Sequence, residues 1–185
     1  MIQVTDLSPL APSFVFTELV VLRLVHILGG IFWLGSGLFT TFFLMPALGR
    51  VGPAAGPVMG ALQQRRLFTV LPVVALLTIL SGVRLLHIMS AGFAPTYIAS
   101  RTGQTYLWSG IAAVAAFLLS LLVSRPAAVR AGQLGATMAS LPEDQRAGRL
   151  VELERLRRRS GVSSIVATTL LVGAAAGMAV ARYLG

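Results

Sequence analysis

The sequence predicts an all-α integral membrane protein, a four-helix bundle with a cytoplasmic amphipathic helix between its third and fourth spans. The chain has 185 residues, of which 56% are hydrophobic and only 11% charged, and its mean hydropathy is +0.83. Soluble domains with a wetted surface do not reach these values. Four apolar stretches approach the ~20 residues that a bilayer-spanning helix needs. We therefore expect a single membrane domain over residues 1–185, with the lipid bilayer as its main partner.

The four spans are expected over residues 14–48, 67–89, 106–123 and 163–184. The first is longer than a bilayer core requires, so it must tilt or protrude. Pro46 and Gly49 mark its end, and Pro72 is expected to bend the second span by removing one helical hydrogen bond. Gly173 and Gly177 form a small-xxx-small pattern that favours tight helix contact. Such Gly/Ala faces also suit contact with subunits of a larger membrane complex or with a second copy of the chain.

Residues 124–161 are the only large polar segment, with eight of the fifteen basic residues and four of the six acids. Ser140 and Glu143 have the spacing of a capping box, and Pro142 suits an early helical position. We therefore expect a helix over residues 141–159 in this cytoplasmic loop. Leucines spaced three residues apart would let it lie on the membrane surface.

The arginines predict the orientation of the bundle. The loops after the first and third spans hold eleven, whereas the opposite side holds Arg101 and Arg182. Cytoplasmic loops carry such an excess, so we expect an inner cell membrane with both termini outside. The net charge of +9 then reflects topology, and no nucleic-acid partner is expected. Because the first basic residue is Arg23, within a long apolar run, the first helix is expected to be retained rather than cleaved as a signal peptide.

The first span contains a stripe that combines an ionisable pair with small residues. Arg23, His26, Gly30 and Trp33 recur three or four residues apart and therefore share a helix face. A histidine next to glycines leaves room for a flat partner, such as a porphyrin, to lie against the backbone. The chain has no cysteine, which excludes disulfides and thiolate metal sites, and its only other histidine is His87.

The second span ends in an echo of this pattern. Arg84 precedes His87 by three residues, as Arg23 precedes His26. Because consecutive spans run antiparallel, both histidines are expected at similar depth near the outer surface, with the arginines beside them. Glu18 is the only nearby acid on that side, so an external anion would fit between these cations.

These observations predict a b-type haem between the first two spans, with His26 and His87 as axial metal ligands and the arginines near the propionates. Ionisable groups within a membrane span are functional candidates by default. The candidate cofactor-binding residues are His26, His87, Arg23, Arg84, Gly30 and Trp33. Of these, Trp33 fits a structural core position better than a wall of the haem pocket. The expected function is electron transfer or haem handling, either alone or as a subunit of a larger membrane complex.

Two alternatives stay open. Met89 and Met178 also reach the outer layer, and a set of His and Met ligands suits Cu(I), which would make this a copper-handling membrane protein. In the other alternative, the arginines extend to the headgroups, the histidines form hydrogen bonds at the interface, and the chain is a cofactor-free structural subunit. The sequence names no catalytic residue and leaves open whether the protein is an enzyme.

The stretch from Leu24 to Gly35, LVHILGGIFWLG, resembles the first helix of the copper-resistance-D-like membrane proteins, their relatives of unknown function, and the haem-J type of protoporphyrinogen oxidase. The resemblance covers mainly the first two spans. It implies a small helical bundle in which His26 is a haem ligand, as in the haem-J type, or part of a copper-handling site. The third span lacks the histidine-rich segment of the haem-J type, and the chain has no lysine. Porphyrinogen oxidation is therefore not expected.

Overall fold

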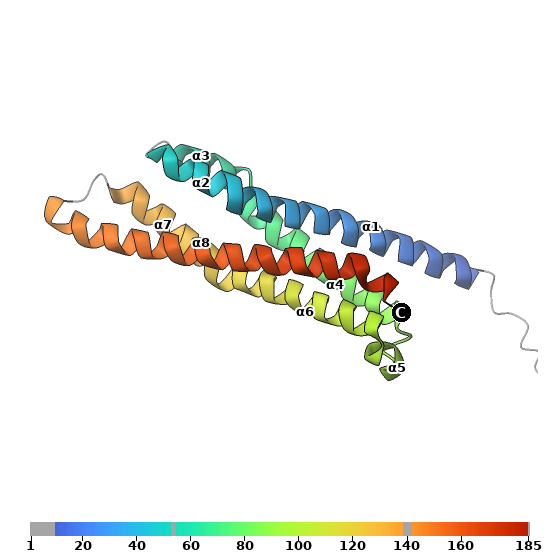
Figure 1. The fold of residues 1–185 in the computed structure, drawn as a ribbon. Helices are drawn as coiled ribbons and strands as arrows, with labels where there is room; N and C mark the ends of the chain where they lie inside the picture. The colour runs from blue at the N-terminus through green and yellow to red at the C-terminus, as the bar shows by residue number, and fades with distance from the viewer. Residues whose placement is uncertain (1–9, 53–54, 139–141, 185) are drawn as a thin grey trace, which may run out of the picture.

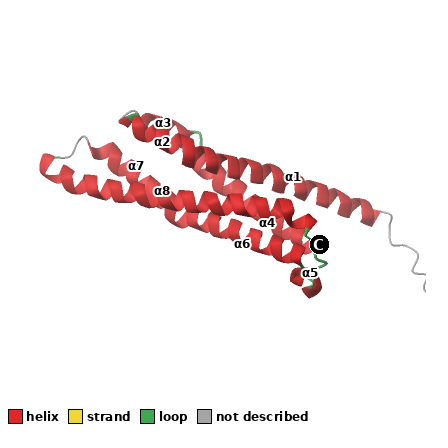
Figure 2. Ribbon diagram, viewed as in Figure 1, coloured by secondary structure: helices red, strands yellow, loops and turns green. Residues whose placement is uncertain are grey.

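The computed structural model describes residues 10–52, 55–138 and 142–184, and every regular element in these ranges is a helix (Figures 1 and 2). The first half of the chain forms α1 (Leu10–Phe39), a π-helical turn (Thr40–Leu44), α2 (Met45–Arg50), α3 (Ala55–Gln64) and α4 (Leu67–Met89). The second half forms α5 (Pro95–Ala99), α6 (Arg101–Leu119), a π-helical turn (Ser120–Ser124), α7 (Arg125–Thr137), α8 (Glu143–Val180) and a 3-10 turn (Ala181–Tyr183).

Four continuous helical stretches of the described residues are long and apolar enough to cross a membrane, and the all-helical structure confirms the predicted all-α class. They comprise Phe16–Arg50, Leu67–Met89, Arg101–Thr137 and Glu143–Tyr183. The second has the predicted bounds and runs unbroken through Pro72. The first and third pass through π-helical turns just before Pro46 and Pro126. A proline lacks the N–H of a regular helical turn, and a widened turn accommodates it without ending the helix.

The predicted cytoplasmic loop over residues 124–161 is itself helical, which corrects its boundaries. Residues 125–137 prolong the third span as α7, and α8 is one helix from Glu143 to Val180 instead of a surface helix followed by a span. A lone Gly161 is too weak a breaker to end a helix, and Ser163 Oγ bonds to the carbonyl of Arg159 within it. Ser140 of the expected capping box lies outside the described residues, and Pro142 at the N-cap makes no side-chain hydrogen bond.

The extended parts of α7 and α8 lie side by side (Figure 1). Leu153 is buried on α8, and Ala127 and Ala131 are buried on α7. The predicted leucine face is therefore only partly covered, because Leu153 is buried whereas Leu150 is 52% exposed.

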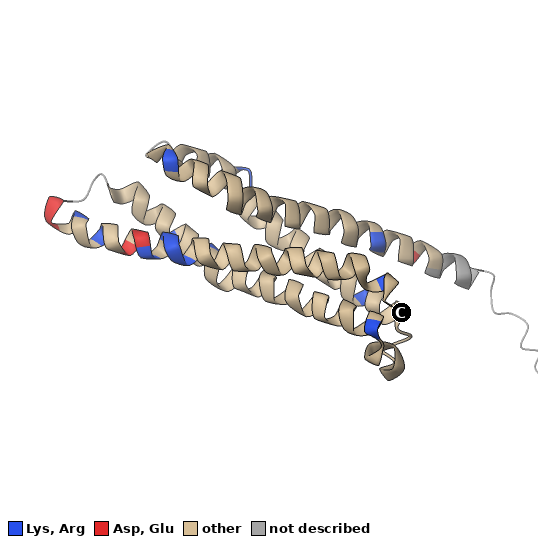
Figure 3. Ribbon diagram, viewed as in Figure 1, with Lys and Arg blue, Asp and Glu red and all other residues tan. Residues whose placement is uncertain are grey.

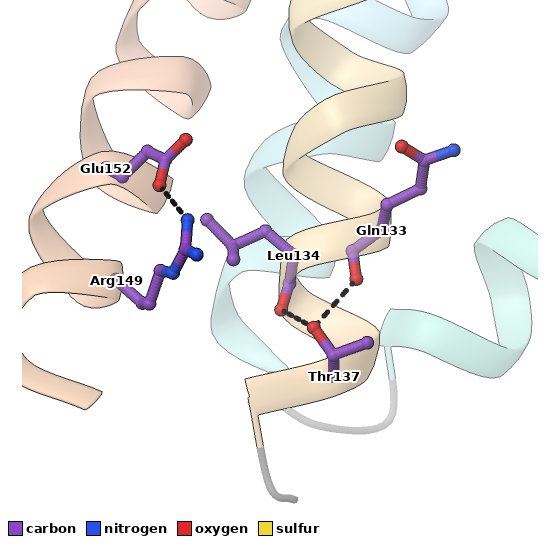
Figure 4. A network of polar contacts seen from close by, with 5 residues as sticks. All are labelled: Gln133, Leu134, Thr137, Arg149 and Glu152. Atoms are coloured by element: carbon purple, nitrogen blue, oxygen red, sulfur yellow. Dashed lines mark hydrogen bonds and ion pairs between the residues drawn. The ribbon is translucent and has the colours of Figure 1, made fainter. Parts of the chain in front are cut away.

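Figure 4 shows polar contacts near the tip of this helix pair. Arg149 and Glu152 form an ion pair of 2.8 Å with both side chains about half exposed. Thr137 Oγ1 donates to the carbonyl oxygens of Leu134 and Gln133. Each of these contacts lies within a single helix, so neither joins α7 to α8.

All four long helices meet in one core. The buried cluster consists of Trp33 from α1, Ala75 from α4, Ala116 from α6, and Ala167 and Leu171 from α8. The Trp33 ring lies edge-on to Phe117 with 6.3 Å between the ring centroids. The small residues around it let the helices approach closely. Trp33 is therefore the central packing residue of the bundle.

The outward faces of the bundle are apolar, and charged residues lie toward its two ends (Figure 3). We call the end of the bundle at which α1 and α6 begin, and at which the C-terminus lies, the amino-terminal end (Figure 1). The opposite end, with α2, α3 and α7, is called the arginine-rich end (Figure 1). Exposed leucines, isoleucines and valines cover the surface between them, including Leu28, Ile31 and Leu122, each about two-thirds exposed. A lipid bilayer suits this apolar belt.

Candidate functional site

His26 lies in the contact between α1 and α4. Its Nδ1 is 2.8 Å from the carbonyl oxygen of Thr78. A carbonyl oxygen only accepts hydrogen bonds, so Nδ1 is the donor in this contact, and in the neutral imidazole the lone pair then lies on Nε2. Metal-binding histidines commonly have their tautomer and ring orientation fixed by such a bond to the backbone. The bond to Thr78 therefore fixes the orientation of the His26 ring and, in the neutral form, its tautomer.

Gly82 on α4 provides the space for this ring. A Cβ atom at Gly82 would lie 2.6 Å from Cε1 and 3.0 Å from Nδ1 of His26. Any side chain there would push the imidazole away from α4 and from the Thr78 carbonyl. Thr78 and Gly82 therefore belong to the site, although the sequence pattern of the first span did not point to either.

The two glycines beside His26 differ in how closely α4 approaches them. A Cβ at Gly29 would overlap Thr78 Oγ1, and one at Gly30 would lie 3.8 Å from Thr78 Cγ2. The space that the missing side chains leave is taken by α4, because small residues let two helix backbones approach. A Cβ at Gly30 would make only an ordinary contact, so its predicted place at a cofactor stays a prediction. Trp33 lies in the buried core, in line with the packing role favoured for it.

The structure does not bring His26 and His87 to the same level. Because His26 faces Gly82 and Gly29 faces Thr78, the antiparallel register places His87 opposite the turn that contains Val20. That turn lies roughly 9 Å along the helix axis from His26, at 1.5 Å per residue. The expectation of similar depth is therefore corrected: His87 lies closer to the amino-terminal end.

His87 is exposed and its ring is engaged differently. Its Nδ1 is 3.3 Å from Nη1 of Arg84. A guanidinium only donates, so Nδ1 of His87 accepts and the proton lies on Nε2, the reverse of His26. Phe93 lies edge-on to the His87 ring, with 5.2 Å between centroids. Phe93 is held there by a left-handed turn, in which its N–H donates to Ser90 Oγ at 2.8 Å.

Arg84 also forms an ion pair with Glu18, the acid expected on the same side of the bundle. Its Nε is 2.8 Å from Oε1 of Glu18 on α1. This ion pair compensates the Arg84 charge, so the expected external anion has no role there. Arg23 is exposed, and no ion pair joins it to any carboxylate of the described residues. Of the two cations expected near the cofactor, only Arg23 is available to a further anion.

Two groups of residues result. His26, Thr78 and Gly82 form one in the helix contact, and Arg84, Glu18 and His87 form the other closer to the amino-terminal end. Across the described residues, no cluster of three or more His, Cys, Asp or Glu side chains is placed to hold a metal ion.

No family model, no curated protein and no solved structure matches this chain. The resemblance of residues 24–35 to the copper-resistance-D-like and haem-J-like proteins therefore stays a prediction.

Proposed function

We propose that the protein is a membrane b-type haem protein for electron transfer or haem handling, with His26 as the axial ligand that this chain supplies. The observation that carries the proposal is the fixed tautomer of His26. Its Nδ1 proton is bound by Thr78, which in the neutral imidazole leaves the Nε2 lone pair within an apolar span. An ionisable group in such a position is a functional candidate, and Nε2 of a neutral imidazole is a common haem ligand.

The other residues of the predicted site fit this proposal in different degrees. Arg23 lies about one helical turn from His26, toward the amino-terminal end, and is an exposed cation suited to a propionate. His87 can take a second axial position only if its Nε2 loses its proton and its ring leaves Arg84. Haem b, when bound, supplies a one-electron ferric/ferrous couple. The protein would supply the nitrogen ligand, the apolar surroundings and the cation.

The orientation proposed for this function has both termini outside an inner cell membrane. The support is the excess of arginines at one end of the bundle. Reporter fusions after Gly185 test it: a periplasm-active reporter is expected to work and a cytoplasm-active one to be silent. The reverse result would place His26 in the inner half of the membrane and contradict the orientation.

The direct test of the proposal is the optical spectrum of the purified protein after expression with haem supply. We expect a Soret band and a reduced-minus-oxidised α band, both lost in His26→Gln. Glutamine can still donate to the Thr78 carbonyl, so this variant keeps the helix contact but has no imidazole. If the wild-type protein has neither band, the haem proposal is wrong.

Two other functions would then be separated by metal analysis of the same sample. Bound copper without a Soret band would favour copper handling, since Nε2 of His26 also suits Cu(I). A sample with neither cofactor would favour a structural subunit. The hydrogen bond from His26 to Thr78 supports that second candidate, because it links α1 to α4 without any ligand.

A further inference from the structure

A groove at the amino-terminal end of the bundle lies outside the contact between α1 and α4. It is formed by α6 and the last residues of the chain, which pack against each other. The residues that line it are Arg101, Gln104, Thr105, Trp108, Ser109 and Leu184. Ser109 is buried where α8 approaches α6, and a Cβ at Gly177 would overlap its hydroxyl. The remaining lining residues face outward and give the groove its chemistry.

The groove is polar toward one end and apolar toward the other. Arg101 and Gln104 are exposed at the start of α6, and the indole of Trp108 lies two helical turns further along, roughly 10 Å at 1.5 Å per residue. Trp108 is 66% exposed. Thr105 Oγ1 donates to the Arg101 carbonyl, so the outward-facing side-chain donors are those of Arg101 and Gln104 at the polar end and the indole N–H of Trp108. Tryptophan at a membrane boundary commonly lies at headgroup level.

The positive charge of Arg101 has no protein partner among the described residues. The two ion pairs there join Arg84 to Glu18 and Arg149 to Glu152. Arg182, the other cation near the C-terminus, lies over the ring of Tyr183, 4.6 Å from its centroid. The groove therefore combines an uncompensated guanidinium with an exposed aromatic surface.

We propose that this groove binds a phospholipid with an anionic headgroup. The headgroup phosphate lies at Arg101 and Gln104, because a guanidinium pairs with phosphate through parallel hydrogen bonds. The start of an acyl chain lies along Trp108. A free phosphate shares the headgroup chemistry but leaves the indole surface unused, so a lipid fits the whole groove better.

The chain contains its own reporter for the test. It has two tryptophans, of which Trp33 is buried and Trp108 exposed, so lipid-borne quenchers act on Trp108. The protein is reconstituted in phosphatidylcholine bilayers that contain a small fraction of acyl-brominated lipid, either phosphatidylglycerol or phosphatidylcholine. Brominated phosphatidylglycerol is expected to quench at about a fivefold lower mole fraction, the preference expected of one arginine at a membrane surface.

Arg101→Gln is expected to abolish this preference, while Arg182→Gln keeps it. Both residues lie at the same end and carry the same charge, but only Arg101 lines the groove. Arg101 is exposed, so its replacement leaves the core intact. Equal quenching by both lipids, or a preference that survives Arg101→Gln, overturns the proposal. Inorganic phosphate at constant ionic strength distinguishes the ligand: suppression of the preference would assign the site to free phosphate, whereas an unchanged preference supports a lipid.

Discussion

The contact between α1 and α4 and the contact between α6 and α8 are both made where a glycine lets another helix approach, but they admit different groups. Gly82 admits the imidazole of His26, and Gly177 admits the hydroxyl of Ser109. The imidazole uses one nitrogen to bind the neighbouring helix and retains a second nitrogen with a lone pair. Ser109 has no metal-ligating nitrogen. A glycine spacing therefore indicates close packing, and only the ionisable group that enters the space indicates a site.

The contact between α6 and α8 continues through uncharged hydrogen bonds toward the arginine-rich end. Ser124 Oγ and Ser163 Oγ lie 2.8 Å apart and are buried. Ser160 Oγ donates to the Ser124 carbonyl. These residues hold the third and fourth spans together without presenting a charge or an unused imidazole. The two contacts are thus comparable in packing and differ in chemistry, which makes them suited to matched substitutions.

Gly82→Ala is expected to have the largest effect. Its Cβ would lie 2.6 Å from Cε1 of His26, so the ring must leave the Thr78 carbonyl. We expect haem content per folded protein to fall at least tenfold, as measured by the pyridine haemochrome. Gly177→Ala is the matched control, which overpacks the other contact at a cost of about 1–3 kcal/mol. It is expected to lower the Tm in detergent and to leave the haem content of the folded fraction unchanged. Equal haem loss in both variants would remove the distinction between the contacts.

Arg23→Gln is expected to lower the reduction potential of the bound haem, because a nearby cation disfavours the extra positive charge of ferric iron. At ~10 Å and an effective dielectric constant of ~20, one charge contributes roughly 1.7 kcal/mol, on the order of 70 mV, before screening by headgroups. Removal of the neutral pair by the double substitution Glu18→Gln with Arg84→Gln is expected to change the potential much less. A redox titration in which the double variant shifts more than Arg23→Gln would show that the ion pair, and not Arg23, lies next to the haem.

A smaller effect is expected at the uncharged contact. The interaction between Ser124 and Ser163 should stabilise the bundle by about 0.6 kcal/mol, the average for hydrogen bonds between membrane helices. A double-mutant cycle with Ser124→Ala and Ser163→Ala, followed by unfolding in mixed micelles, measures this coupling. The haem spectrum should stay the same in all three variants. A spectral change would mean that the two contacts are coupled.

His87→Ala is expected to change the spectrum least, because His87 lies at a different level from His26 and has its proton on the ligating nitrogen. The absorption bands and the haem content should match those of the wild type. Loss of a bis-histidine signature in electron paramagnetic resonance would restore His87 as the second ligand. The ring would then have to leave Arg84 and Phe93 when haem binds.

The positions of the long helices are predictable from the sequence, since an apolar run bounded by polar residues is a local property. The span over residues 67–89 illustrates this, because Arg66 and Ser90 flank it. The continuity of α8 is harder to predict from the sequence. The sequence pattern of its first half predicts a polar surface helix. The packing of α8 against α7 and the burial of Leu153 appear only in the structure.

The site is only partly predictable. His26 stands out as an ionisable residue in an apolar run, but its partners depend on the register between α1 and α4, which no local pattern specifies. A usable signal does exist on α4: Ala75, Thr78 and Ser81 are small, share one face and are all buried. That stripe identifies the surface that receives a neighbouring helix, with Gly82 beside it. The pairing of Glu18 with Arg84 depends on the same register.

The most direct measurement of the central claim is the chemical rescue of His26→Gly by free imidazole. This variant removes the ligand and leaves a space beside Gly82 into which imidazole can diffuse. We predict that the purified variant lacks the Soret and α bands, and that imidazole together with haem restores both, whereas a bulkier substituted imidazole does not. If His26→Gly keeps the wild-type spectrum without imidazole, then His26 is not the haem ligand and the account is wrong.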